Sequence, residues 1–228
     1  MSRMFLIDGK PMRTWNCFVG CFLNCTYCNA RKAAETRFKH MARYKDGFTP
    51  KLVERELRRQ FKSGEFVFIA YMGDISFATA EIVQRILERV GKMLATSFLF
   101  LTKDPAAYRY WQEAGGVVFP NHIYLGTTIE SNRDYGVSKA PEPAARGYFM
   151  AQIQHPKKFI SIEPVMDFDL EVMTRWMLDI RPDIIEVGAD NYHNNLEEPP
   201  PAKLKALLRD LKKICPVVVE KPGLERLL

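Results

Sequence analysis

Four of the five cysteines in this 228-residue chain lie within residues 17–28, which read CFVGCFLNCTYC. Three of them, Cys21, Cys25 and Cys28, stand at the spacing C-x-x-x-C-x-x-C. At this cysteine frequency, about 0.002 such matches are expected by chance. Three thiolates on one short loop can each hold one iron atom of a four-iron cluster, so the fourth iron is left open to a small ligand. The spacing therefore predicts a reactive 4Fe-4S site.

A closed zinc site is the main alternative for these thiolates, with Cys17 as the fourth ligand. Structural zinc sites usually combine two C-x-x-C pairs that lie far apart in the sequence, and this chain has one such pair. A zinc site would make the chain a nucleic-acid-binding protein without catalysis. An iron-sulfur cluster without substrate chemistry would make it an electron carrier. Reduced cysteines without any metal are disfavoured, because four of them are crowded into one loop.

The elements that must position this loop are predicted from the composition and the apolar pattern. With 47% hydrophobic residues, the chain can build one sizeable core, so we expect a single domain over residues 1–228. It has no run of eighteen apolar residues, and its N-terminal apolar stretch is too short for a signal peptide. The clustered, odd number of cysteines fits a reducing compartment. We therefore expect a cytoplasmic protein with no membrane partner.

Apolar runs of strand length alternate with helical stretches along most of the chain. Strands are expected at residues 14–18, 66–71, 98–102, 122–129, 158–163, 183–188 and 217–220. Helices are expected at residues 30–40, 50–62, 79–94, 144–153 and 170–180, after Asp104 and Pro105, and after the triple proline at 199–201. Such repetition with short links indicates a parallel sheet with right-handed crossovers. The pattern predicts an α/β fold, a partial (β/α)6 TIM-like barrel with one extra C-terminal strand.

Polar residues end most of the predicted strands, where such barrels carry their function. Several share the parity that points into the barrel, namely Thr128 with Glu130, Ser161 with Glu163, and Glu186 with Asp190. Inward carboxylates need partners, so they predict either a polar ligand or an internal ion network with Lys103 and Arg133.

The aromatic residue Tyr27, directly before Cys28, extends the cysteine motif. This combination resembles the radical S-adenosylmethionine (SAM) superfamily. The shorter segments TWN, YCNA, LTK, IES and SIEP resemble a small phage-associated, largely uncharacterised radical SAM group, which is similar to spore photoproduct lyase and its DNA-repair-like relatives. Cys17 stands where that group usually has proline. After Cys28 only Cys215 remains, so no accessory cluster domain is expected.

The resemblance implies that a reduced 4Fe-4S cluster transfers an electron into the sulfonium of SAM and gives methionine and a 5′-deoxyadenosyl radical. That radical would abstract hydrogen from a substrate, which the relatives suggest is a nucleic-acid base or nucleotide of DNA or RNA. The reaction subtype stays open between a lyase, a transferase and a base-modifying enzyme. A non-nucleotide small molecule or peptide is the alternative substrate. A reductant such as flavodoxin or ferredoxin is also implied.

The resemblance also implies roles for individual residues. Cys21, Cys25 and Cys28 would bind the metal cluster. The residues that would bind the cofactor are Tyr27 near the adenine, Met72, Gly73 and Asp74 at the turn that meets the amino group, and Lys103, Thr128 and Glu130 at later strand ends. Glu163 and Glu186 are expected to be catalytic.

Three further features concern the substrate. Cys215 would be catalytic as a hydrogen-atom donor, or else a small buried hydrophobe. Arg31 and Lys32 begin a basic segment that would bind phosphates, or else form a solvated helix face, in a chain of net charge +6. Asp190 and His193 lie in a polar loop that would contact substrate, although a solvated loop histidine is the plainer interpretation.

Overall fold

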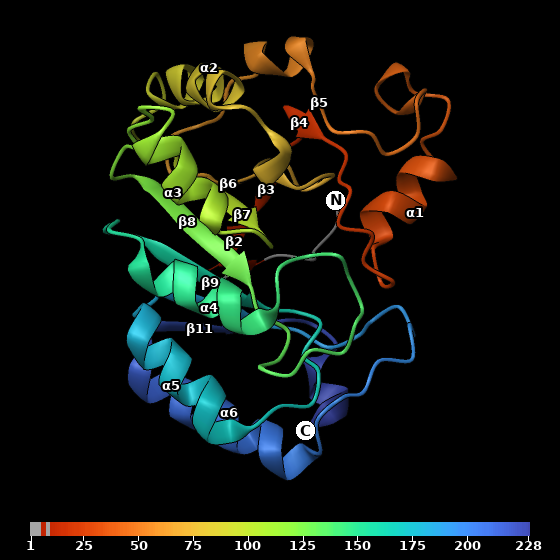
Figure 1. Cartoon of the computed structure of the whole chain (residues 1–228), viewed down its shortest axis with the longest axis vertical. Coiled ribbons are helices and arrows are strands. Elements are labelled where there is room, and N and C mark those ends of the chain that lie inside the picture. Colours follow the sequence, from red (N-terminus) through yellow and green to blue (C-terminus); the bar gives the residue numbers. More distant parts are fainter. Residues whose placement is uncertain (1–5, 8–9) are drawn as a thin grey trace.

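The computed structural model describes residues 6–7 and 10–228, and its main feature is a curled, seven-stranded parallel sheet (Figure 1). The strand order is β11-β10-β9-β8-β7-β6-β3. These strands are β3 (Arg13–Trp15), β6 (Phe66–Ile69), β7 (Ser97–Thr102), β8 (Ile123–Thr128), β9 (Lys158–Ile162), β10 (Ile184–Val187) and β11 (Val217–Glu220). The predicted α/β class and partial TIM-like barrel with an extra C-terminal strand are confirmed.

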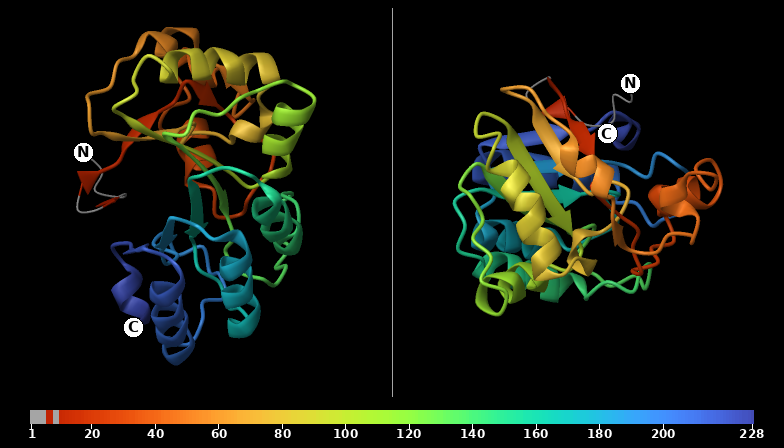
Figure 2. Two further views of the ribbon diagram at one scale, coloured as in Figure 1. Left: turned by 90° about the vertical axis from the view of Figure 1, so that its left-hand side faces the viewer. Right: turned by 90° about the horizontal axis from the view of Figure 1, so that it is seen from above.

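Helices follow the strands and cover the outer face of the sheet, except for the first. They are α1 (Asn29–Glu35), α2 (Ala80–Val90), α3 (Ala106–Glu113), α4 (Pro143–Gln152), α5 (Leu170–Ile180) and α6 (Pro201–Ile214). Figures 1 and 2 show α2 to α6 on the convex side, whereas α1 projects beyond the carboxyl ends of the strands. The 3-10 turns are η1 (Ala42–Tyr44), η2 (Glu54–Arg58), η3 (Ile75–Phe77) and η4 (Leu224–Leu227).

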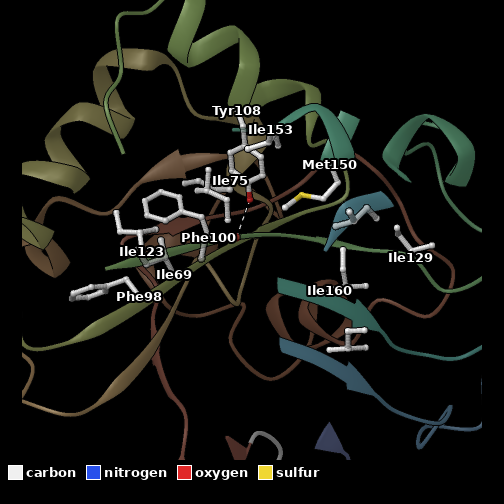
Figure 3. Packing of buried hydrophobic residues seen from close by; sticks show 14 of the residues in the cluster. Ile69, Ile75, Phe98, Phe100, Tyr108, Ile123, Ile129, Met150, Ile153 and Ile160 are labelled. Atoms are coloured by element: carbon white, nitrogen blue, oxygen red, sulfur yellow. Dashed lines mark hydrogen bonds between the residues drawn. The ribbon is translucent and has the colours of Figure 1, made fainter. Parts of the chain in front are cut away.

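The main core lies between the sheet and helices α2 to α6. Side chains on the outer face of the strands, such as Ile69, Phe100 and Ile160, are fully buried there (Figure 3). The Tyr108 hydroxyl donates to the carbonyl oxygens of Phe100 at 2.8 Å and Gly126 at 2.9 Å, so this buried polar group is satisfied.

The inner face of the sheet changes from apolar to polar along the strands. A separate core group that includes Phe68, Leu99 and Phe159 fills the inner face near the amino ends. The alternation of side chains then brings Thr128, opposite Ser161, to the inner face at the carboxyl ends. The chain thus places its inward polar residues at the end of the barrel where α1 lies.

The helix predicted at residues 50–62 is wrong. Residues Lys51–Leu52 form β5, which pairs antiparallel with β4 (Phe18–Val19), and η2 follows. The Trp15 indole donates to the Glu56 carbonyl oxygen at 2.9 Å, and the Val53 amide donates to that of Cys17 at 2.7 Å. These tertiary bonds outweigh the helical pattern. The first predicted strand is divided between β3, which pairs with β6, and β4, which pairs with β5.

The N-terminal segment forms a short antiparallel pair, β1 (Leu6–Ile7) and β2 (Lys10–Pro11). The rest of that segment, on which the expectation of no signal peptide depends, lies outside the described residues. None of the helices formed by residues 6–7 and 10–228 has the length and apolar character that a membrane crossing requires.

Candidate active site

The four cysteines of the loop at residues 17–28, called the cysteine loop from here on, point in two directions. Cys17 is fully buried in the main core with Trp15. Cys21, Cys25 and Cys28 belong to a different, smaller core group beneath α1. Burial raises the pKa of the Cys21 thiol to about 12, and Asp74 and the other two thiols add to this effect. Cys17 is therefore separated from the three motif cysteines, which lie near one another.

Close backbone packing fixes the start of the cysteine loop. Gly20 forms a β-bridge with Gly73, which follows β6. The Gly20 amide donates to the Met72 carbonyl oxygen at 2.9 Å, and the Asp74 amide donates to the Gly20 carbonyl oxygen at 3.1 Å. A Cβ atom on Gly73 would lie 2.7 Å from the Gly20 carbonyl oxygen. Gly73 is thus needed for contact with the loop, and Met72 is buried in the same core group as the loop.

Two other segments hold the rest of the loop. The Arg31 guanidinium donates to the Cys21 carbonyl oxygen at 2.6 Å and lies 5.1 Å from the centre of the Phe48 ring. The segment between β8 and α4 forms two backbone hydrogen bonds with the loop. The Lys139 amide donates to the Leu23 carbonyl oxygen at 2.6 Å, and the Thr26 amide donates to the Val137 carbonyl oxygen at 2.9 Å. The loop therefore has the same kind of backbone support as a secondary-structure element.

The thiols themselves accept hydrogen bonds, which suits thiolate ligands. The Cys21 sulfur accepts from the Leu23 amide at 3.3 Å, and the Cys28 sulfur caps α1 by accepting from the Arg31 amide at 3.3 Å. Hydrogen bonds to sulfur tune iron-sulfur clusters. Among the described residues, no three His, Cys, Asp or Glu side chains stand at the spacing of a single metal ion. A four-iron cluster takes each cysteine at a separate iron atom, so its ligands need not converge on one point.

A cavity of about 230 Å³ opens between the cysteine loop and the carboxyl ends of the strands. The residues on its wall nearest the loop are Tyr27, Cys28, Asn29, Lys103 and Thr128. On the side of the later strands the wall includes Ser161, Glu163, Glu186, Asp190, Asn191 and Tyr192. The cavity thus brings together Cys28 and six other predicted site residues, namely Tyr27, Lys103, Thr128, Glu163, Glu186 and Asp190.

One carboxylate beside this cavity is fully matched by cations. Glu130 interacts through one oxygen with the Tyr27 hydroxyl and the Lys103 ammonium, and accepts from Arg146 at 2.6 Å through the other. Burial alone would raise its pKa, but Lys103 and Arg146 hold the pKa of Glu130 at about 2. We call Tyr27, Lys103, Glu130 and Arg146 the Glu130 group. Its carboxylate orients Tyr27 and Lys103, which themselves line the cavity.

Asp74 has a similar supporting position. One of its oxygens accepts from the Ser76 amide at 3.0 Å and the Thr102 hydroxyl at 2.5 Å, and the other accepts from the Lys103 amide at 2.9 Å. Asp74 is absent from the cavity wall. Its carboxylate joins the ends of β6 and β7 and so positions Lys103.

A second carboxylate group lies at the ends of β9, β10 and β11. Glu163 pairs with Lys221, which also lies 3.7 Å from Glu186, and Glu186 accepts from the Ser161 hydroxyl at 2.8 Å. Burial raises the pKa of Glu163 to about 7, and nearby Glu186 adds to this, against the effect of Lys221. We call Ser161, Glu163, Glu186 and Lys221 the Glu163 group. Gly188 provides the space for it, because a Cβ there would lie 2.7 Å from the Glu163 carboxylate.

The polar loop after β10 is held by Asp190. Its carboxylate accepts from the backbone amide of Asn194 at 2.6 Å and from that of Tyr192 at 3.3 Å. This fold of the loop brings Tyr192 to the cavity wall and leaves His193 exposed, outside that wall. Asp190 therefore positions the loop, and the structure does not bring His193 to the site.

Other predicted residues lie elsewhere. Cys215 is buried at the amino end of β11, where its thiol donates to the Val217 carbonyl oxygen at 3.3 Å. Since the cavity lies at the carboxyl ends, the hydrogen-donor hypothesis is corrected in favour of a buried hydrophobe. Lys32 is exposed on α1, whereas Arg31 is used inside the cysteine loop rather than on a phosphate-binding rim. Arg133 pairs with Asp167 at 2.5 Å outside the cavity.

Arg146, Lys221 and Tyr192 were missed by the sequence reasoning. Lys221 follows the last strand with the inward parity of Val219, so the strand-end rule would have found it if applied to β11. Arg146 lies in the middle of α4, where no strand-end pattern applies.

Comparison with known proteins places this fold. Residues 11–188 match the family described as "Protein of unknown function (DUF5131)". The chain belongs to the DUF5131 family. No curated protein sequence matches this DUF5131 protein.

Solved structures of spore photoproduct lyase resemble the DUF5131 protein in fold. The complex with dinucleoside spore photoproduct has a TM-score of 0.62 at 8% identity and covers 90% of this chain and 75% of the lyase chain. A double mutant of the lyase with bound AdoMet and dinucleoside spore photoproduct has a TM-score of 0.59 at 10% identity, with coverage of 91% and 75%. The resemblance inferred from the motifs is thus confirmed at the level of the fold.

Proposed function

We propose that this protein is a radical SAM enzyme that acts on a nucleic-acid base or nucleotide. The observation that carries the proposal is the separation of Cys17 from Cys21, Cys25 and Cys28, which leaves three thiols on a braced loop above the strand-end cavity. Three cysteines are the number that hold a four-iron cluster with one iron open. The fold shared with spore photoproduct lyase supports the proposal.

The residues present fit both cofactors. Cys21, Cys25 and Cys28 would hold the 4Fe-4S cluster, and the wall formed by Tyr27, Lys103 and Thr128 would hold SAM. Tyr27 supplies an aromatic surface, Thr128 a hydroxyl and Lys103 a cation for the carboxylate of SAM. When bound, the cluster and SAM supply one-electron chemistry that leads to hydrogen abstraction from a substrate.

The protein's own residues orient these groups and limit the access of water. The Glu130 group keeps the Lys103 ammonium at the wall, and Asp74 holds the Lys103 backbone. Phe68, Tyr71 and Leu101 make the wall largely apolar between the polar groups. The substrate would occupy the side lined by Glu163, Glu186 and the loop of Tyr192. A DNA-type substrate is supported by the dinucleoside spore photoproduct named in the similar lyase structures.

The test starts with protein purified without oxygen. It should be brown, absorb broadly near about 400 nm and contain iron and sulfide. After reduction with dithionite it should convert SAM to 5′-deoxyadenosine, and deuterium should pass into that product from labelled nucleosides, DNA or RNA. Colourless protein that contains zinc would support the nucleic-acid-binding alternative instead, and brown protein without 5′-deoxyadenosine formation would support an electron carrier.

Cysteine variants provide matched controls. Cys21→Ala, Cys25→Ala and Cys28→Ala should each abolish 5′-deoxyadenosine formation and lower the iron content. Cys17→Ala and Cys215→Ala remove thiols that lie in the main core, so both should keep iron and activity. Loss of iron in Cys17→Ala with no loss in Cys21→Ala would contradict the assignment.

A further inference from the structure

The two sides of the cavity differ in the chemistry that they offer a ligand. The side near the cysteine loop presents the ammonium of Lys103 and the hydroxyls of Tyr27 and Thr128. The side formed by β9 and β10 presents the carboxylates of Glu163 and Glu186. One side therefore offers mainly hydrogen-bond donors, and the other offers mainly acceptors.

The side formed by β9 and β10 offers hydrogen-bond acceptors because of how Lys221 and Asp190 are placed. Lys221 is buried and is not part of the cavity wall, so it contacts the two carboxylates from behind. Asp190, although it lies on the wall, directs its carboxylate to the amides of its own loop. The oxygens offered to a ligand are thus those of Glu163 and Glu186. Among residues 6–7 and 10–228, one lysine serves these two carboxylates, so N–H donors on a ligand would be stabilised there.

The same side carries flat apolar surfaces. Tyr71 and Tyr192 both line the cavity, and Tyr192 remains 52% exposed at its mouth. Aromatic rings beside a polar edge are the usual means of holding an extruded or single-stranded base, which stacks on the rings and is recognised along its edge. A planar heterocycle fits this combination better than a peptide or a sugar does.

We propose that this side of the cavity binds a guanine-type base through its adjacent ring N–H and exocyclic amino group, with Glu163 and Glu186 as acceptors and Tyr71 and Tyr192 as stacking surfaces. The inference rests on the proposed function and names the substrate class of the same site. Guanine presents two neighbouring donors along one edge. Adenine and cytosine place an acceptor nitrogen beside their amino group, and thymine and uracil flank a single N–H with two carbonyl oxygens that carboxylates would repel.

Equilibrium binding tests the inference without turnover. Oxygen-free, unreduced protein is titrated by calorimetry with dGMP, dIMP, dAMP, dCMP and dTMP. The dIMP base is guanine without the exocyclic amino group, so dGMP should bind about tenfold more tightly than dIMP or any other nucleotide. Equal affinity for dGMP and dIMP, or no dGMP binding below about 1 mM, would overturn the inference. This comparison of ligands needs no variant and so does not depend on the folding of one.

Variants then locate the contact. Glu163→Gln and Glu186→Gln should each weaken dGMP binding about tenfold and change dIMP binding less. The control is Glu220→Gln, an exposed glutamate that pairs with Lys212 outside the cavity, and it should leave dGMP affinity unchanged. Unchanged dGMP affinity in Glu163→Gln would refute the contact. Selective dGMP binding by a protein that makes no 5′-deoxyadenosine would refute the proposed function and leave the inference standing.

Discussion

The Glu130 group and the Glu163 group lie at neighbouring strand ends of one cavity, but their charges are balanced differently. Glu130 has two cations, Lys103 and Arg146, and its pKa is held at about 2. Within the part of the chain that the structure describes, Glu163 and Glu186 share one cation, Lys221, and the pKa of Glu163 is raised to about 7. The first carboxylate is ionised throughout the physiological range, whereas the second exchanges a proton near pH 7 and is an ionised acceptor above that pH.

This difference in charge balance suggests different roles, with one group supporting neighbouring side chains and the other available to a ligand. A carboxylate with all its partners inside the protein gives rigidity to the side chains around it, here Tyr27 and Lys103. A carboxylate pair with too few partners leaves interaction capacity for a ligand. Both groups are largely buried, so burial does not distinguish them. They differ in the number of cations that pair with their carboxylates.

The largest expected effect comes from removing the charge of the first group. Glu130→Gln leaves the buried cations Lys103 and Arg146 without a carboxylate, so it should lower the free energy of unfolding by about 3–5 kcal/mol. Glu163→Gln is the matched control and should not lower it at pH 7, because it removes a carboxylate whose pKa burial has raised and leaves Glu186 beside Lys221. Urea denaturation measures both. Equal losses in the two variants would remove the contrast between the groups.

The next effect tests the backbone support on the loop side. A Cβ atom on Gly73 would lie 2.7 Å from the Gly20 carbonyl oxygen, and neither backbone can move freely. Gly73→Ala should therefore destabilise the protein by about 2–3 kcal/mol. Gly91→Ala is the control, because a Cβ there would lie at an ordinary 3.4 Å from the Leu87 carbonyl oxygen. If Gly73→Ala melts at the same temperature as Gly91→Ala, the loop is not held at this point.

The third effect is the pH dependence of the second group. Lys221, Glu186 and Tyr71 surround Glu163, whose pKa of about 7 lies above that of an unfolded glutamate. The folded state then binds more protons between about pH 4.5 and 7, so the free energy of unfolding should fall by about 1–3 kcal/mol as the pH rises through this range. Glu163→Gln should remove most of that slope in urea titrations. A slope that persists in the variant would assign it to other groups.

The smallest effect compares two adjacent basic residues. Arg31→Met removes the hydrogen bond to the Cys21 carbonyl oxygen and the contact with the Phe48 ring, and should lower the free energy of unfolding by about 1–2 kcal/mol. Lys32→Met changes an exposed side chain and should stay within about 0.5 kcal/mol. A larger loss for Lys32→Met than for Arg31→Met would contradict the role of Arg31 inside the cysteine loop.

The sequence predicted the barrel well because strand and helix periodicity is a local property. Even the inward parity of Thr128, Ser161 and Glu186 was recoverable, since side chains alternate along a strand. The helix at residues 50–62 failed because Lys51–Leu52 pairs with β4, a contact that no local pattern records. Propensity is a weak guide where such long-range pairing competes with it.

The sequence predicted which strand ends form the site better than it predicted the role of each residue there. Asp74 and Glu130 were both expected to bind SAM, yet their carboxylates are engaged by Thr102, Lys103 and Arg146. Sequence position cannot distinguish a carboxylate that faces a ligand from one that faces its neighbours. That depends on partners far away in the chain, such as Arg146 on α4 and Lys221 after β11.

The bracing of the cysteine loop by Gly73, Arg31 and the segment at residues 137–139 has a consequence for maturation. In zinc fingers the metal supplies the folding free energy, and the empty chain is unfolded. Here the chain's own bonds shape the loop, so newly synthesised polypeptide should reach its final shape before any inorganic group is delivered. For the proposed iron-sulfur cluster, an assembly factor would then meet a loop that is already folded, and protein that had lost the cluster to oxygen could be reloaded without being unfolded.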